Sequence, residues 1–507
     1  MNKNLFKALA FGSLVGLTAT PALTSCSNDD TVTDNGNGDL VFNGNQIGNG
    51  DNEFVFTGKR TLTKGTYHLK GWVYVAAGSE LTIEPGTVIK GDKETKAALI
   101  VEPGGKLYAR GTASQPIVFT SEAAPGQRKA GDWGGVIICG KAQNNAGTKK
   151  IEGGPRTEFG GNDNADNSGV LSYVRIEFAG YPFQPDQEIN GLTLGSVGSG
   201  TQIDHVQVSY SNDDSFEWFG GSVNCKYLIA YRGWDDDFDT DNGYSGSVQY
   251  GLAVRDPHIA DKSQSNGFES DNDADGSTSA PVTSATFSNI TFIGPKAEAG
   301  NAFLNEKGQD ITGGDIYPNN GSELGKFQAA MQIRRGSRLN CINSVAIGWP
   351  VGLILDGEKG DTREQADNGG LRLTNLWFAD MTATGTDANK EYDDVRIDYV
   401  TGADGKRTAV KDNTQQSFSA TFFLKAQNHN TVRTLSELNL TGANTYTGLN
   451  VNFMPAPGSP LTANAASFDG ISSSWFDHVS FAGAFDTGDA SWLDGWTNFD
   501  PQHTVYE

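Results

Sequence analysis

A near-repeat in the middle of the chain constrains its fold more than any other feature. The segment Asp213-Asp214-Ser215-Phe216-Glu217 returns 22 residues later as Asp235-Asp236-Asp237-Phe238-Asp239, and the Phe-acid pair returns again as Phe268-Glu269. A repeat of this length, joined by short apolar runs, predicts coils of a solenoid that stack on one another. Equivalent residues then line up in columns, and we expect the three phenylalanines to form an inward-facing stack.

The same region holds a large share of the chain's charge. Between Ser211 and Gly276 there are 14 acidic residues and 4 Lys or Arg residues, a balance of −10, whereas the whole chain carries −23. Adjacent strands lie about 4.8 Å apart, so two stacked aspartates repel by on the order of 3 kcal/mol at an effective dielectric near 20. A divalent cation would remove this repulsion, and calcium is expected first because every candidate ligand is a hard oxygen. The predicted ligands in these two coils are Asp213, Asp214, Asp235, Asp236, Asp237, Asp239 and Asp241.

A second set of candidate ligands follows in the segment Asp271 to Gly276. It reproduces the Asp-x-Asp-x-Asp-Gly opening of a calcium loop, in which alternate side chains point inward and the glycine permits a sharp turn. The twelfth position is Val282 instead of a bidentate glutamate, which argues against an EF-hand proper. We therefore predict Asp271, Asp273 and Asp275 as metal ligands, with a solvated acidic turn as the alternative.

The N-terminus predicts where the protein works. Lys3 and Lys7 precede an apolar run that ends at Leu23-Thr24-Ser25-Cys26, which is typical of a secretory signal over residues 1–25. The Leu-x-Ser-Cys ending resembles a bacterial lipobox, so Cys26 is the predicted lipid attachment site that holds the protein to the membrane. The acidic pair at Asp29 and Asp30 resembles a surface-export signal, which implies an outer-membrane lipoprotein that faces the cell surface. A chain this acidic is not expected to bind nucleic acid.

The rest of the chain predicts one long domain. Residues 26–51 are polar and rich in Asn and Gly, as in a flexible tether. From residue 52 to 507, short β-forming runs alternate with Gly, Asn and Asp turns, and Glu-Pro-Gly turns at Glu84 and Glu102 recur after 18 residues, a period that suits one coil. The predicted fold class is all-β, a single-stranded right-handed parallel β-helix, with a loop elaboration around residues 382–439.

Two smaller groups of residues receive structural interpretations. Cys139, Cys225 and Cys341 lie in or beside apolar runs and are expected to be buried thiols, with one disulfide plus a free cysteine as the alternative. Three arginines lie between Arg334 and Arg338. They are interpreted as surface residues for solubility, and neutralisation of an anionic ligand is the alternative.

Several blocks of the chain resemble a known family. The runs GDWGGVIICG at 131–140, VSYSNDDSFEWFGG at 208–221, GWDDDFDTDNGYSG at 233–246 and NGFESDND at 266–273 are similar to those of secreted or lipid-anchored β-helix proteins of the Bacteroidota. The ending from Phe453 to Phe499 resembles the final coils of that family. The resemblance covers most of residues 60–507 and implies the fold and the location, whereas the family's activity is poorly assigned.

The aromatic residues among the acids indicate a binding function. Trp218, Trp234 and Tyr244 alternate with carboxylates and are predicted to face a ligand such as a glycan. The interpretation is a calcium-stabilised binding module that captures a ligand or partner protein, beside a TonB-dependent outer-membrane transporter. An adhesin or structural surface protein is a further alternative.

An enzyme is the main alternative to a binding module. A calcium-dependent polysaccharide lyase needs a base, for which Arg232, Arg255 and Lys226 are candidates, and a glycoside hydrolase needs paired carboxylates such as Asp213 and Asp236. The large number of adjacent acids favours metal binding over a tuned acid and base. Fold analogy alone does not establish an activity.

Overall fold

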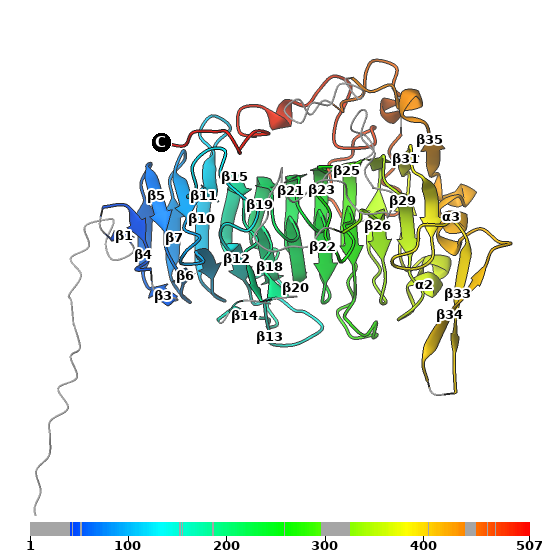
Figure 1. Cartoon of the computed structure of the whole chain (residues 1–507), viewed down its shortest axis with the longest axis horizontal. Helices are drawn as coiled ribbons and strands as arrows, with labels where there is room; N and C mark the ends of the chain where they lie inside the picture. Colours follow the sequence, from blue (N-terminus) through cyan, green and yellow to red (C-terminus); the bar gives the residue numbers. More distant parts are fainter. Residues whose placement is uncertain are drawn as a thin grey trace, which may run out of the picture.

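Two long sheets of stacked strands form the body of the protein (Figure 1). The computed structural model describes residues 41–507 except 43, 51–52, 152–153, 155, 185–186, 258, 296–324, 404, 442–452, 464 and 472. Neighbouring strands of both sheets pair in parallel, apart from the antiparallel pair of β1 and β2. This arrangement confirms the predicted all-β class and the parallel β-helix. The predicted signal peptide and the lipid site Cys26 lie outside the described residues.

The smaller of the two sheets carries the repeat. It has 11 strands, in the order of the chain. They are β3 (Glu53–Phe56), β6 (Trp72–Val75), β9 (Ala98–Val101), β12 (Gly135–Cys139), β18 (Leu192–Val197), β20 (Phe216–Gly221), β22 (Phe238–Asp241), β24 (Phe268–Ser270), β26 (Ala329–Ile333), β29 (Val351–Leu355) and β32 (Ala383–Thr386).

The larger sheet has 18 strands and covers the opposite side of the core. Its members are β1 (Val41–Phe42), β2 (Gln46–Ile47), β4 (Lys59–Leu62), β5 (Thr66–Leu69), β7 (Glu80–Ile83), β8 (Val88–Gly91), β10 (Lys106–Arg110), β11 (Ile117–Ser121), β15 (Gly169–Glu177), β19 (Gln202–Ser209), β21 (Asn224–Tyr231), β23 (Ser247–Val254), β25 (Thr286–Ile293), β27 (Asn340–Ile342), β28 (Val345–Ile347), β30 (Leu373–Thr374), β31 (Trp377–Ala379) and β35 (Thr431–Arg433).

The coils change shape along the solenoid. At the N-terminal end each coil gives two short strands to the larger sheet, and from β15 to β25 one longer strand replaces them: β15 pairs with β10 through its first half and with β11 through its second. Two short strands per coil return after β25, which pairs with β27 and then with β28. A single residue in the left-handed conformation marks the bend in each longer strand, and neighbouring rings at this position stack at 4.2, 4.4 and 4.9 Å. Asn takes this position at the far end because it tolerates positive φ. The column consists of Tyr173, His205, Tyr227, Tyr250, Asn289, Asn343 and Asn375.

The 22-residue repeat marks one coil, as predicted, but the 18-residue spacing of the Glu-Pro-Gly turns does not. Phe216 pairs with Phe238 in adjacent strands. In contrast, the turn at Glu84 follows β7 of the larger sheet and the turn at Glu102 follows β9 of the smaller one. The two turns therefore occupy different corners of the coil. The same short turn sequence suits both corners, so its spacing does not report the length of a coil.

The core lies between the two sheets. Phe216, Phe238 and Phe268 are fully buried and their rings follow one another at 5.6 and 5.9 Å, which confirms the predicted inward-facing stack. Cys139, Cys225 and Cys341 are buried and free, which confirms the preferred interpretation of the three thiols. Within the described residues, no helix has the length and apolar character needed to cross a bilayer.

Both ends of the solenoid are elaborated. The first strands, β1 and β2, lie within the segment predicted as a tether, and β2 pairs with β5. The predicted elaboration at residues 382–439 holds β32, the antiparallel hairpin of β33 (Arg396–Thr401) and β34 (Arg407–Asp412), helix α3 (Phe418–Phe423) and the short 3-10 turn Ala426–Asn428. Phe423 of α3 stacks on Phe378 at 4.1 Å and closes the core. Helix α2 (Thr362–Asn368) lies beside this cap (Figure 1).

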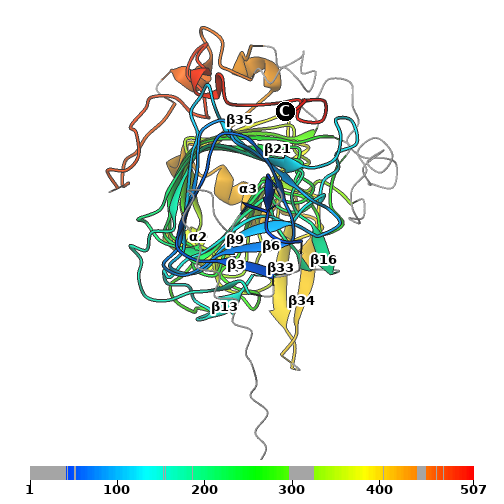
Figure 2. The ribbon, with the colours of Figure 1, turned by 90° about the vertical axis from the view of Figure 1, so that its left-hand side faces the viewer.

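Residues 453–507, the C-terminal segment, are not the final coils that their resemblance implied. They run back along the outside of the larger sheet toward the N-terminal end, as Figures 1 and 2 show. The side chains of Gln249, Gln207 and Lys90 donate to the backbone carbonyls of residues 477, 498 and 506 at 2.8, 2.7 and 2.8 Å. The segment contains 3-10 turns at Pro460–Thr462 and Ser491–Leu493 and no strand among its described residues.

Two smaller hairpins and one turn complete the described structure. Strands β13 (Lys149–Lys150) and β14 (Glu158–Phe159) pair on the outer side of the smaller sheet, and β16 (Pro182–Gln184) pairs with β17 (Gln187–Glu188). A further 3-10 turn spans Leu435–Leu438. The ring of Phe159 packs against Phe219 at 6.0 Å, so β14 covers the outer side of the smaller sheet beside β20.

Candidate metal site on the acidic face

The register of the smaller sheet places three acids in one column. Glu217 of β20 pairs with Asp239 of β22, which pairs with Glu269 of β24. Successive side chains in a strand point to opposite faces, so these acids face outward where their phenylalanine neighbours face the core. The column continues into Gln332 of β26, which carries no charge. The repeat therefore builds an acidic stripe on the outside of the solenoid.

A ladder of side-chain amides and carboxylates runs beside this stripe. The Oδ1 atom of Asp214 accepts from the backbone amide of Asp236 at 2.8 Å, and Oδ1 of Asp236 accepts from the amide of Asn266 at 2.5 Å. Asparagines continue the ladder on both sides. The Oδ1 atom of Asn190 accepts from the backbone amide of Asp214, and that of Asn266 accepts from the amide of Ala329, at 3.1 Å each. One oxygen of each aspartate thus has a structural role that asparagine fills elsewhere. The second oxygen of each carboxylate is not needed for the ladder.

Two groups of carboxylates have oxygens close enough to share a cation. In the first group, Asp213, Asp214 and Asp235 offer ligand atoms that all lie within 4.8 Å of one another, and in the second Asp214, Glu217 and Asp239 do the same. Asp214 belongs to both. An oxygen of Asp235 and one of Asp239 are buried without a hydrogen-bond partner. The other oxygen of Asp235 accepts from the Ser263 hydroxyl at 2.7 Å. This donor set is made of hard oxygens, which fits calcium.

The surroundings of these carboxylates oppose their negative charge. Burial, followed by the charge of neighbouring acids, raises the pKa of Asp214, Asp235 and Asp239 well above the ordinary value. Burial raises the pKa of Asp241 to about 7, with the charge of Asp271 adding to it. Burial and neighbouring negative charge therefore favour the protonated forms of these carboxyl groups. A bound cation would replace the protons, because metal ligands must be deprotonated.

Two of the predicted ligands have other partners. Asp237 forms a fully buried ion pair with Arg255 at 2.9 Å. Burial raises its pKa to about 6 against the opposing effect of that arginine. Asp236 holds its place in the ladder and belongs to neither carboxylate group. Asp241 lies two residues after Asp239 on the same face. The charge of Lys149 partly opposes the rise in the Asp241 pKa that burial causes, and the Lys149 ammonium group donates to the Asn242 side chain at 2.8 Å.

The structure does not gather the predicted calcium loop around one centre. Arg334 and Arg335 reach the Asp271 carboxylate at 2.9 and 2.6 Å. Asp273 accepts from the backbone and hydroxyl of Ser277 and from the amide of Asp275, as in a turn. Among the described residues, the two metal-capable groups include none of these three aspartates. The alternative of an acidic turn fits better, because arginines on the next coil occupy the first carboxylate.

Arg334 and Arg335, which directly follow β26, are therefore not simply surface residues. Arg334 contacts Glu269 as well as Asp271, and only 12% of its side chain is exposed. The coil after Glu269 thus places positive charge beside the acids of the preceding coil. The interpretation of Arg334 and Arg335 as solubility residues is wrong, since strand register rather than local sequence decides which charges become neighbours.

The prediction of ligand-facing aromatics is wrong. Trp218, Trp234 and Tyr244 are at most 1% exposed. Trp218 lies two residues after Phe216 and so shares its inward face, where it stacks on Tyr244 at 5.3 Å. The Tyr244 hydroxyl donates to the Val223 carbonyl at 2.8 Å. Strand alternation, which was readable in the repeat, assigns Trp218 to the core.

Two acids of the stripe were absent from the predicted ligands. Glu217 and Glu269 occupy the position of Asp239 in their own coils. The Asn190 amide donates to Glu217, which fixes that carboxylate beside the ladder. The signal that identifies them is the alignment of the repeat, in which the residue after each phenylalanine is acidic.

Comparison with known proteins establishes the family. Residues 55–423 match the model of the pectate-lyase-like β-helix domain, so the chain belongs to this family. Among solved structures, the Dettilon tailspike protein is similar at 12% identity and a TM-score of 0.25, over 66% of this chain and 59% of the tailspike chain. The chain thus spans under two thirds of that protein. No curated protein matches the sequence.

Proposed function

We propose that the protein is a lipid-anchored surface module whose acidic face binds calcium and, through it, an oxygen-rich ligand such as a glycan. The observation that carries the proposal is the pair of carboxylate groups that share Asp214, with buried oxygens of Asp235 and Asp239 that have no hydrogen-bond partner. Calcium takes six to eight oxygen ligands, so three carboxylates leave coordination positions for a ligand.

The position of these groups supports binding rather than burial of an ion in the core. Asp213, Asp235 and Asp239 are partly exposed, whereas Asp214 and Glu217 lie deeper. A cation held here would have protein oxygens on one side and solvent on the other. On the solvent side, the hydroxyl or carboxylate oxygens of a sugar could take the coordination positions that water molecules would otherwise fill. A TonB-dependent transporter is the partner we propose for such a module on the cell surface.

Calcium titration of wild-type protein and two matched variants tests the proposal. Asp214→Asn keeps the ladder acceptor, as Asn190 and Asn266 do, but removes the carboxylate common to both groups. Asp236→Asn makes the same change one coil further along and leaves both groups intact. Calorimetry should detect calcium binding in the wild type and in Asp236→Asn, and a loss of at least about tenfold in affinity for Asp214→Asn. Equal binding by all three proteins, or by none, would contradict the cation site.

An enzyme is the second candidate, supported by the raised pKa values of the acids. A carboxyl that stays protonated near neutral pH can act as a general acid, which a glycoside hydrolase requires. The bases considered for a lyase are engaged elsewhere. Arg255 and Arg232 are paired with Asp237 and Asp256 at 2.9 Å each, and Lys226 contacts Asp477 of the C-terminal segment at 2.7 Å.

Product analysis separates the two candidates. With calcium present, the binding module should retain polysaccharide without releasing reducing or unsaturated ends. Release of reducing ends that disappears in Glu217→Gln would favour the hydrolase. An ultraviolet-absorbing unsaturated product would favour a lyase whose base is none of Arg232, Arg255 and Lys226.

A further inference from the structure

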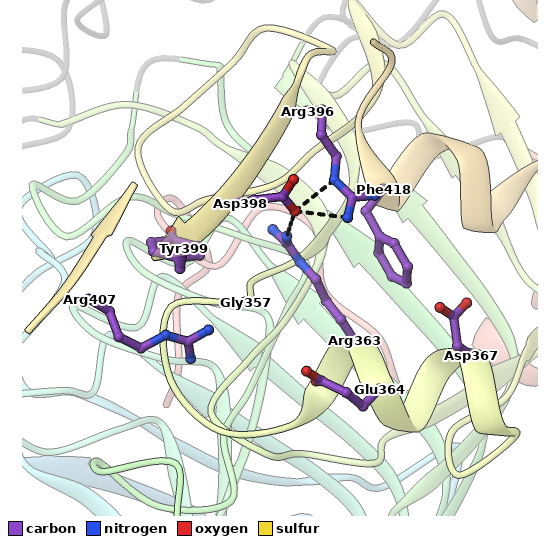
Figure 3. A pocket seen from close by; sticks show the side chains of 9 residues that line it. All are labelled: Gly357, Arg363, Glu364, Asp367, Arg396, Asp398, Tyr399, Arg407 and Phe418. Carbon is purple, nitrogen blue, oxygen red and sulfur yellow. Dashed lines mark hydrogen bonds and ion pairs between the residues drawn. The ribbon is translucent and has the colours of Figure 1, made fainter. Parts of the chain in front are cut away.

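A pocket of about 260 Å³ lies at the C-terminal end of the solenoid, several coils beyond the acidic face. Helix α2, the β33–β34 hairpin and the start of α3 surround it (Figure 3). It is smaller than the roughly 300–1,000 Å³ of sites for drug-sized ligands, so its occupant is small. Its lining residues are mostly charged: Gly357, Arg363, Glu364, Asp367, Arg396, Asp398, Tyr399, Arg407 and Phe418.

Arginines and aromatic rings alternate along one wall of the pocket. Arg407 lies over the Tyr399 ring at 5.5 Å, and Arg363 lies 5.9 Å from that ring and 5.6 Å from Phe418. Arg396 covers Phe418 at 5.4 Å. Both aromatic rings therefore have guanidinium groups against them, and the wall offers N–H donors instead of free rings.

The arginine in the centre of this wall is rigidly held. Arg363 is buried, and it donates to the backbone carbonyls of Leu355 and Ile397 at 2.8 and 2.7 Å and also to that of Asp387. Backbone acceptors from three separate segments fix its position before any ligand binds. The position of Arg363 in the wall is thus set before binding, which lowers the entropic cost of using this arginine.

Most charges of the pocket are already neutralised. Asp398 contacts Arg396 at 2.8 Å and Arg363 at 3.8 Å, and Asp367 pairs with Lys425 at 2.6 Å. Two charges are the exception. Within the described part of the chain, neither the Arg407 guanidinium nor the Glu364 carboxylate has a hydrogen bond or ion pair.

These two groups face each other across the pocket. Arg407 comes from the hairpin and Glu364 from α2, and in Figure 3 both point into the space between these elements. One wall therefore presents a free cation and the other a free anion. A ligand that carries only negative charge would meet Glu364 and Asp367, and one that carries only positive charge would meet the arginines.

We propose that this pocket binds a small zwitterion of the amino-acid type. The ligand carboxylate lies on the Arg407 guanidinium, whose planar fork suits a carboxylate, and the ligand ammonium group lies on Glu364. This proposal does not depend on the calcium site, and removal of calcium leaves it unchanged.

A thermal-shift screen with each of the twenty proteinogenic amino acids at about 10 mM identifies the ligand, and calorimetry on EDTA-treated protein then measures its affinity. Two analogues of that amino acid test the two contacts. The N-acetyl derivative lacks the ammonium group and the amide lacks the carboxylate. Each should bind about 10-fold to 100-fold more weakly than the parent amino acid, the range expected for one hydrogen bond to a charged group.

Variants assign the contacts to residues. Arg407→Ala should bind the amino acid and its amide equally, and Glu364→Gln should bind the amino acid and its N-acetyl derivative equally. Arg433→Ala is the matched control, because Arg433 is an exposed arginine over an aromatic ring, Trp377 at 5.9 Å, outside the pocket. Its affinity should equal that of the wild type. Absence of binding by all twenty amino acids, binding of glucuronate in their place, or an equal loss in Arg433→Ala would overturn the proposal.

Discussion

Removal of calcium should destabilise this protein by an amount that grows with pH. A ligand that binds only the folded state stabilises it by about 2.7 kcal/mol at a hundredfold excess over Kd. An unfolding entropy of about 2.1 cal/mol/K per residue gives roughly 1 kcal/mol/K for a domain of about 460 residues. Each ion should therefore raise the melting temperature by about 3 °C, and two ions sharing Asp214 by roughly 5 °C.

The sign of the pH effect follows from the raised pKa values. Burial and neighbouring acids hold the pKa of Asp214 and Asp239 above the unfolded value of about 3.9, and that of Asp241 at about 7. The folded state therefore binds protons at these carboxyls more tightly than the unfolded state. This contribution to the free energy of unfolding is fully present below about pH 4 and is lost as the pH rises through the pKa values of the folded state. Calcium requires the deprotonated forms, so its contribution increases over the same range.

Differential scanning calorimetry from pH 5 to pH 8, with calcium or with EDTA, measures both effects. The gap between the two melting temperatures should widen toward pH 8 in the wild type. In Asp214→Asn the gap should close, and the melt in EDTA should fall less steeply with pH than that of the wild type. Asp236→Asn serves as the control for a charge removed from the same ladder. If calcium raised the melting temperature of Asp214→Asn as much as that of the wild type, Asp214 would not be the ligand common to both carboxylate groups. If the gap narrowed toward pH 8, calcium would not be replacing protons on these acids.

Three further predictions concern the anchor and the coil stack. Cys26→Ala should leave the protein soluble or with an uncleaved signal, as fractionation and mass spectrometry would show, whereas protease added to intact cells should cut the wild type. Phe238→Ala should lower the free energy of unfolding by about 3–5 kcal/mol in denaturant titration, because it removes a fully buried ring between two others. Arg334→Ala should lower it by up to about 3 kcal/mol in the same assay, because it leaves Glu269 and Asp271 without a major partner.

Matched controls make these outcomes specific. Val410→Ala removes an apolar side chain that is 49% exposed and should change stability by less than about 0.5 kcal/mol. Arg433→Ala removes an exposed arginine whose charge acts on the equally exposed Glu437, and it should behave likewise. Wild-type protein protected from protease until cells are lysed would contradict surface display. If Val410→Ala lost as much stability as Phe238→Ala, the packing argument would be contradicted. If Arg433→Ala lost as much as Arg334→Ala, the charge argument would be contradicted.

Strand alternation explains which residues of the site could be predicted. The repeat indicated both the Phe216, Phe238 and Phe268 stack and the acidic columns, because coils that stack in register carry equivalent residues to equivalent places. Side chains of a strand alternate between its two faces, so an inward Phe216 also places Glu217 outside and Trp218 inside. The sequence therefore contains the signal for the place of both residues.

Other features depend on contacts between residues far apart in the chain. Arg334 meets Asp271 because an intervening segment of more than sixty residues returns the chain to the same sheet one coil later. The return of the C-terminal segment over the larger sheet likewise rests on contacts such as Gln207 with residue 498. The sequence around Asp271 does not show which residues lie near it in space. Its calcium-like motif therefore gives no sign that Arg334 and Arg335 pair with the first carboxylate.

The sequence by itself determined the stacked-coil architecture, the inward phenylalanines and the concentration of acids on a few coils, because a period of hydrophobic and acidic residues is a local property of the chain. The tertiary structure alone decided which carboxylates lie close enough together to share a cation. Cation binding depends on oxygens being within a few ångströms of one another. Asp213, Asp214 and Glu217 are neighbours in the sequence, but only the register between coils brings Asp235 and Asp239 of the next coil close to them.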